Sequence, residues 1–219
     1  MLQRVDPDPS AGLLSLVQWL SPAFPTGAYA YSHGLEFEIA AGRVKSAPEL
    51  AAWLGQVLAF GAGLQDAILL AHALESGADI AQLAGLARAL APSAERLAET
   101  LEQGAAFARA ASAITGRDMP PVALPIAVGH AAQTLGLPKA QVVALYLHAF
   151  AANLVSAAVR FVPLGQTEGQ RVLAGLHAGI QALAVQAVSA SLDDITTSAL
   201  RADLAAMGHE TMQVRIFRT

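Results

Sequence analysis

Six histidines are the side chains best suited to chemistry in this sequence, which contains no cysteine. A histidine can bind a metal ion or exchange a proton near neutral pH. The six lie at His33, His72, His130, His148, His177 and His209. Because none has another histidine three or four residues away, a metal site could form only from different helices. The spacing predicts no metal site, and His33 and His209, in two unusual segments, are the better candidates for functional contacts.

Motifs that would carry catalysis are absent. His209 and Glu210 begin like a zinc-protease motif, but Gln213 stands where the second histidine is required. The sequence has no Gly-x-x-x-x-Gly-Lys loop for a nucleoside triphosphate and no Gly-x-Ser-x-Gly turn for a nucleophilic serine. We therefore expect a protein that is not an enzyme and that carries no cofactor.

The segment of residues 21–36 interrupts an otherwise helical, alanine-rich chain. It contains prolines that fix the backbone, glycines that allow left-handed conformations, and amphipathic aromatic rings. These residues are Pro22, Pro25, Gly27, Gly34, Tyr29 and Tyr31. A simple connector needs fewer unusual residues, so we expect a structured functional loop, and a rigid packed connector is the alternative.

Two further segments are candidates for recognition. Arg160 ends a long apolar helix, where it either favours the helix dipole or forms a polar recognition edge with Gln166. Near the end of the chain, Arg215 and Arg218 flank an apolar pair that includes Phe217. Arginine and aromatic residues concentrate binding energy at interfaces, so this pattern favours docking to a partner. The alternative is a tail folded onto its own domain.

The composition excludes several classes of protein. Hydrophobic residues make up 54% of the 219 residues, charged residues only 14%, and the formal net charge is −4. Two lysines, Lys45 and Lys139, give no clustered positive face for nucleic acid. Residues 1–10 do not have the pattern of a signal peptide, so we expect a cytoplasmic protein. The uncharged stretch 142–159 contains His148, Asn153 and Ser156, which favour a buried helix over a membrane span.

Apolar positions with helical spacing dominate the chain. They predict helices over about 13–20, 35–41, 46–58, 66–74, 79–90, 92–114, 122–135, 138–161, 167–189 and 193–208. No alternating strand pattern is longer than a few residues. We therefore predict an all-α, single-domain bundle of about eight to ten helices over residues 1–208. Residues 209–219 differ in composition, and we expect a partner-binding tail that is mobile alone and orders on its partner.

Three segments resemble the urease accessory protein F (UreF) family. Residues 21–36 are similar to its N-terminal signature, Ser-Pro-x-Leu-Pro-x-Gly-x-Phe/Tyr-x-x-Ser-x-Gly-Leu-Glu. Residues 159–170 are similar to its Arg-Leu-Val-Pro-Leu-Gly-Gln-Thr-x-Gly-Gln motif, and residues 209–218 resemble its closing His-Glu-x-x-x-x-Arg-Leu-Phe. The three segments occur in the same order as in the family, so the resemblance covers nearly the whole chain.

The resemblance implies a non-catalytic, all-α maturation factor that forms a homodimer. Members of the family bind a scaffold accessory protein of the UreD or UreH type and recruit the GTPase UreG. That assembly engages apo-urease and helps to load nickel into its active site. The partner-binding residues expected on this basis are Tyr29, Ser32, His33, Glu36, Arg160, Gln166, His209, Glu210, Arg215 and Phe217.

One stretch departs from the family pattern, and one other function fits the residues. Many relatives carry Arg-Glu-x-Arg upstream of a glycine, whereas here Ala94-Glu95-Arg96-Leu97 precedes Gly104, so the arginines are reduced or shifted. The alternative function is a helical protein that binds a small molecule or a metal through the 21–36 loop. Its residues would be Tyr29, Tyr31, His33 and His209.

Overall fold

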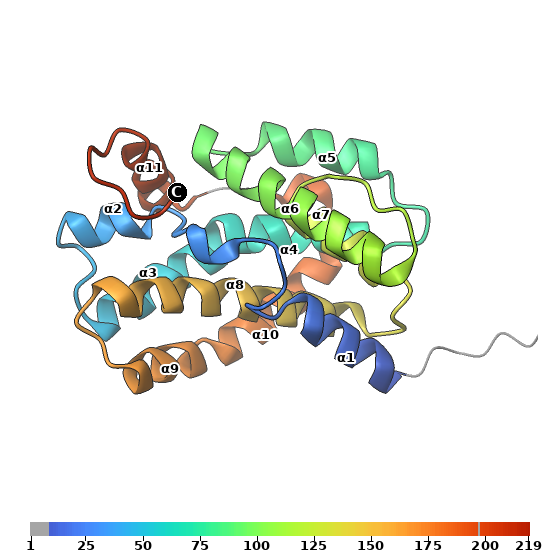
Figure 1. Cartoon of the computed structure of the whole chain (residues 1–219), viewed down its shortest axis with the longest axis horizontal. Coiled ribbons are helices and arrows are strands. Elements are labelled where there is room, and N and C mark those ends of the chain that lie inside the picture. Colours follow the sequence, from blue (N-terminus) through green and yellow to red (C-terminus); the bar gives the residue numbers. More distant parts are fainter. Residues whose placement is uncertain (1–8, 197) are drawn as a thin grey trace, which may run out of the picture.

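The computed structural model describes residues 9–196 and 198–219. This part of the chain contains eleven α-helices, two short 3₁₀ helices and no strand, which confirms the all-α fold (Figure 1). The helices are α1 Pro9–Trp19, η1 Ala28–Ala30, α2 Leu35–Ala40, α3 Ala47–Phe60, α4 Ala62–Ala73, α5 Ile80–Ala89, α6 Ala94–Thr115, α7 Leu124–Ala132, α8 Lys139–Phe161, α9 Gln166–Gly175, α10 His177–Ser189, η2 Leu192–Asp194 and α11 Leu200–His209. Residues 1–8, most of the segment in which we expect no signal peptide, lie outside this description.

Helix α4 forms the centre of the core. All of its residues from Gly63 to Ala71 are buried, including the polar Gln65 and Asp66. It packs against α3, α7, α8 and α10, and α8 packs in turn against α9 and α10. The largest fully buried side chains include Trp53, Phe107, Leu16, Leu147 and Leu154. The core therefore joins helices from the whole length of the chain.

Two helix predictions need correction. The single helix predicted over 167–189 is two helices, α9 and α10, which meet at Leu176 at an angle of 40°. The last helix begins at Leu200 and not near residue 193, because Leu192–Asp194 forms a separate 3₁₀ turn. The Asp194 carboxylate accepts hydrogen bonds from the Ser191 amide and hydroxyl and closes that turn.

The loop between α1 and α2 is ordered and packed. Gly27 and Gly34 have φ values of 75° and 76°, in the left-handed region that glycine tolerates. Among the described residues, His33 is the one non-glycine with a positive φ, at 58°. The Asn153 amide on α8 donates to the carbonyl oxygens of Ala28 and Tyr31 at 3.0 and 3.4 Å. These bonds tie the loop to the helical core.

Two segments are long and apolar enough to cross a membrane: Ala47–Ala73, which comprises α3 and α4, and Lys139–Phe161, which is α8. The bent pair of α9 and α10 would be a third if it formed one span. Within the protein, 72% and 50% of the most apolar stretches of the first two segments are buried. Helix α8 thus packs much of its apolar surface in the core, as predicted for residues 142–159.

Candidate partner-binding surface

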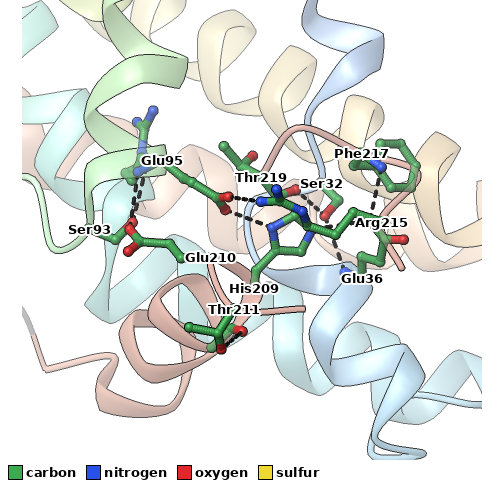
Figure 2. A network of polar contacts seen from close by, with 12 residues as sticks. Ser32, Glu36, Ser93, Glu95, His209, Glu210, Thr211, Arg215, Phe217 and Thr219 are labelled. Carbon is green, nitrogen blue, oxygen red and sulfur yellow. Dashed lines mark hydrogen bonds and ion pairs between the residues drawn. The ribbon is translucent and has the colours of Figure 1, made fainter. Parts of the chain in front are cut away.

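The C-terminal tail, residues 209–219, is held by one carboxylate on α2. Glu36 accepts hydrogen bonds from the backbone amides of Ile216 and Phe217 at 2.8 and 2.9 Å (Figure 2). The Nε2 atom of His209 lies 3.1 Å from a Glu36 oxygen. Glu36 is only 9% exposed, and a buried carboxylate is stable only where hydrogen bonds replace its water. Glu36 is therefore the main anchor of the tail.

His209 connects the tail anchor to α6. Its side chain is wholly buried at the end of α11, and its Nδ1 atom lies 2.6 Å from the Glu95 carboxylate. Its two ring nitrogens thus face two carboxylates, those of Glu36 and Glu95. The second Glu95 oxygen accepts a hydrogen bond from Arg215 at 2.6 Å. This network links α2, α6, α11 and the tail (Figure 2).

The last residue of the sequence lies against the 21–36 loop. The Thr219 carbonyl oxygen accepts hydrogen bonds from both the backbone amide and the hydroxyl of Ser32 (Figure 2). The Thr219 hydroxyl donates to Glu99 on α6 at 3.1 Å and accepts from the His33 amide at 3.3 Å. Ser32, His33 and Thr219 are all buried. The end of the tail therefore packs against the loop that was predicted to be functional.

Phe217 fills an apolar position next to α8. Its side chain is 5% exposed and makes an edge contact with Phe161, with ring centroids 5.1 Å apart. The Arg160 guanidinium lies 5.4 Å from the centre of the Phe217 ring, within range of a cation–π interaction. Arg218 pairs with Glu102 at 2.6 Å and donates to the Tyr31 hydroxyl. Arg160 thus contacts the tail rather than only ending α8.

These contacts favour the alternative of a tail folded onto its own domain, and mobility of the tail without a partner stays a prediction. The tail lies on its own domain because Glu36 and Glu95 supply acceptors and Phe161 supplies an apolar contact. Glu210 adds a further link, since its carboxylate accepts from the amide of Ala94 at 2.8 Å at the N-terminus of α6. Binding of a partner by the tail stays a prediction.

Apolar side chains remain exposed on α11 and on the outer side of the tail. On α11 they are Leu200, Leu204 and Met207, which recur at the spacing of one helical face. On the tail, Val214 and Ile216 are 78% and 66% exposed. The tail folds back beside α11 (Figure 1). Exposed apolar groups gathered in one region are typical of an interaction surface.

A buried ionic cluster lies behind the tail. Arg96 on α6 donates to Asp66 on α4 at 2.8 Å, and the Tyr146 hydroxyl donates to the same carboxylate at 2.9 Å. Burial raises the pKa of Asp66, although the Arg96 charge opposes this. Burial also disfavours the charge on Glu99, but Arg96 and His33 outweigh it and hold the pKa of Glu99 below its usual value. Glu99 therefore joins this cluster to the tail.

A cavity of about 150 Å³ opens above this cluster. Its lining includes the charged residues Asp66, Arg96 and Glu99, and the start of the 21–36 loop contributes Ser21, Pro22, Thr26 and Tyr29. Its aromatic lining consists of Trp19, Tyr29, Phe107, Tyr146 and Phe150. A cavity with apolar walls and a few polar groups has the composition of a small-ligand site.

The ten residues predicted to bind partners fall into three groups. Eight lie in or against the tail network: Ser32, His33, Glu36, Arg160, His209, Glu210, Arg215 and Phe217. Tyr29 lines the cavity and is 69% exposed. Gln166 is the exposed first residue of α9, and among the described residues it makes no hydrogen bond to the tail.

Local sequence patterns do not identify the partners of these residues on α4, α6 and α8. Glu95, Arg96 and Glu99 are charged residues close together on one predicted helix. Charged residues in such a pattern usually face solvent. One pattern in the sequence does indicate that these residues are buried. Arg96, Glu99 and Gln103 share a face of α6 with Phe107, and Phe107 belongs to the core. Within the described residues, no group of three or more histidine, cysteine, aspartate or glutamate side chains could hold a metal ion.

Comparison with known proteins identifies the family. The UreF family model matches residues 44–177. The chain belongs to the UreF family. It is 68% identical over 210 residues to the urease accessory protein UreF of Cereibacter sphaeroides strain KD131, covering 96% of this chain and all of that protein. The proteins of the same name from Jannaschia sp. strain CCS1 and Paracoccus denitrificans are 54% and 53% identical, each over 96% of this chain and over 96% and 98% of their own length.

Proposed function

We propose that this chain is a non-catalytic assembly factor in urease maturation. It bridges a scaffold accessory protein of the UreD or UreH type and the GTPase UreG on apo-urease, and so enables nickel metallocentre assembly. In this proposal nickel is cargo of the assembly, the chain works in the cytoplasm as a homodimer, and it has no catalytic activity. Membership of a family named for urease accessory proteins supports the general role.

The observation that carries the bridging role is the fixed tail. Hydrogen bonds to Glu36 and Glu95 hold the tail on the domain, while Val214 and Ile216 on the tail stay exposed, as do Leu200, Leu204 and Met207 on α11. A binding segment that is already ordered loses less conformational entropy on association than a mobile one. The tail and α11 would therefore present a preformed surface to the scaffold protein.

The test is size-exclusion chromatography with light scattering on the untagged chain mixed with its cognate scaffold protein and GTPase. We compare Ile216→Ser in the tail with the matched control Ile114→Ser on α6, where the isoleucine is 55% exposed and lies far along the chain from the tail. We expect Ile216→Ser to weaken scaffold capture about tenfold, because central apolar contacts dominate interface energies. Ile114→Ser should leave capture unchanged.

The outcomes separate the parts of the proposal. A co-eluting complex of defined mass would support the bridging role and give the number of chains in it. Equal capture by both serine variants would mean that the tail is not the docking surface. Separate elution of all three proteins, with and without GTP and nickel, would contradict the bridging role itself.

The cavity favours a second candidate function, the binding of a small molecule. A cavity of about 150 Å³ with apolar walls can hold a single aromatic ring. Benzamidine and benzamide, which differ in charge, are suitable probes because the lining contains charges of both signs, on Asp66, Arg96 and Glu99. Chemical-shift changes of Trp19 and Phe150 that saturate for benzamidine would support this function. No saturable shift with either probe would argue against it.

A further inference from the structure

The fold brings together two histidines that are far apart in the sequence. His148 lies in the middle of α8, and His177 is the first residue of α10, which packs against α8. Their ring centroids are 5.4 Å apart, with an angle of 48° between the ring planes. We propose that His148 and His177 bind a divalent first-row transition-metal ion through both imidazoles, with water molecules as the remaining ligands.

The separation of the rings suits a shared metal ion. An imidazole nitrogen lies about 2.1 Å from such an ion, so two rings on one ion have centroids roughly 4.5–5.5 Å apart at octahedral or tetrahedral angles. The observed 5.4 Å falls within this range.

The other four histidines are less suited to the same role. His209 is wholly buried between Glu36 and Glu95, and His33 is a buried neighbour of Glu99. The Nε2 atom of His72 lies 3.0 Å from the Ala190 carbonyl oxygen. His130 has a buried Nδ1 atom, and among the described residues no second histidine ring contacts it. His148 and His177 thus form the one histidine pair in the described part of the chain.

The pair is accessible from solvent. His177 is exposed and His148 is half-buried, so an ion can reach both from solvent.

The chemistry of the pair limits which ions it would take. Imidazole suits nickel, copper and zinc, whereas magnesium and calcium prefer oxygen ligands. Two protein ligands leave most coordination positions to water, so the ion would exchange readily. The inference does not rest on the proposed function, because it follows from the ring geometry alone, and either can fail without the other.

The test is isothermal titration of the untagged full-length chain with NiCl₂ and with ZnCl₂ at pH 7.5 in a buffer that does not bind metals. The ligand variants are His148→Gln and His177→Gln, and His72→Gln is the matched control. His148→Phe serves as a second variant that keeps an aromatic ring in contact with His177. NMR spectra of the imidazole nitrogens identify which histidines respond to the metal.

We expect one ion per chain, with the signals of His148 and His177 changed by Ni²⁺ or Zn²⁺. Both glutamine variants and His148→Phe should weaken binding at least tenfold, and His72→Gln should change it less than twofold. A tenfold excess of Mg²⁺ should not compete. Absence of binding up to about 1 mM metal, or equal binding by the wild type and His177→Gln, would overturn the proposal.

Discussion

Glu36 shows how one side chain can fix a whole segment. Its two oxygens receive two backbone amides of the tail and face the His209 ring, while the side chain stays 9% exposed. Hydrogen bonds to a buried charge are worth more than neutral ones, and a missing partner costs the full desolvation penalty. The position of the tail thus depends on a carboxylate 180 residues earlier in the chain.

Glu38 links α2 to α11 in a similar way, and its ionisation makes the stability of the protein depend on pH. It is 1% exposed and accepts hydrogen bonds from Arg43 and from Arg201 on α11. Burial opposes its ionisation, but the two arginines outweigh burial and hold the pKa of Glu38 below its usual 4.5. A lowered carboxyl pKa stabilises the fold above the unfolded-state value, and that stabilisation disappears as pH falls through the folded-state value.

We therefore predict that Glu38→Gln lowers the free energy of unfolding by roughly 2–3 kcal/mol at pH 7, as for a buried ion pair that loses its charge. At pH 3 the difference from the wild type should shrink toward zero. Urea unfolding at several pH values measures the difference in free energy of unfolding between variant and wild type at pH 7 and at pH 3. Glu168→Gln, at an exposed position in the first turn of α9, is the control. A difference that is constant between pH 7 and pH 3 would contradict the role of the Glu38 charge.

At the scale of elements, α6 is positioned by one close backbone approach. A Cβ atom at Gly104 would lie 1.9 Å from the Val122 carbonyl oxygen and 2.7 Å from the Leu124 amide nitrogen. Glycine therefore lets α6 lie directly against the segment that leads into α7. This contact places Arg96 and Glu99, on the same helix, in the lining of the cavity.

Two alanine substitutions test this contact. Gly104→Ala should destabilise the protein by about 3 kcal/mol or more, because backbone has to move. Gly85→Ala, in the middle of α5 with no neighbouring atom within 4 Å, should instead stabilise it by about 0.5–1 kcal/mol. Thermal unfolding followed by circular dichroism measures both. Similar melting temperatures for the two variants would show that α6 can shift at no cost.

The sequence predicts elements better than it predicts contacts between them. Apolar spacing was sufficient for nine of the eleven α-helices in the described residues, because burial of one face is a local pattern. Gly175 stands directly before the bend at Leu176, but the apolar spacing continues across it and a single glycine is tolerated inside a helix, so α9 and α10 were predicted as one helix. Glu36 and His209 were both predicted as site residues, yet their mutual contact depends on tertiary packing that no local pattern encodes.

For the whole molecule, Glu99 connects the tail to the core. It accepts from Thr219 on one side, and on the other it lies 3.8 Å from Arg96, which pairs with Asp66. The last residue of the sequence is thus linked through α6 to the centre of the helical bundle. A partner that displaced the tail would remove a hydrogen bond from Glu99 and change the polar lining of the cavity.

Removal of residues 209–219 is the strongest test of this connection. The truncation leaves Glu36 and Glu95 without tail donors and uncovers Phe161. We predict that helical content by circular dichroism stays largely unchanged, because α4, α7, α8 and α10 pack mainly on one another. The free energy of unfolding should nevertheless fall by roughly 3–5 kcal/mol, since buried carboxylates lose their partners.

A double substitution of the tail surface separates the anchor from the exposed side. Serine at both Val214 and Ile216 removes exposed apolar groups and keeps every backbone donor, so stability should change by less than about 0.5 kcal/mol. Urea unfolding of the wild type, the truncated chain and the double variant gives the comparison. If truncation left the urea midpoint unchanged, the tail would contribute nothing to the fold. The bonds of Glu36, His209 and Thr219 would then be too weak to hold it, and ordering would have to come from a partner.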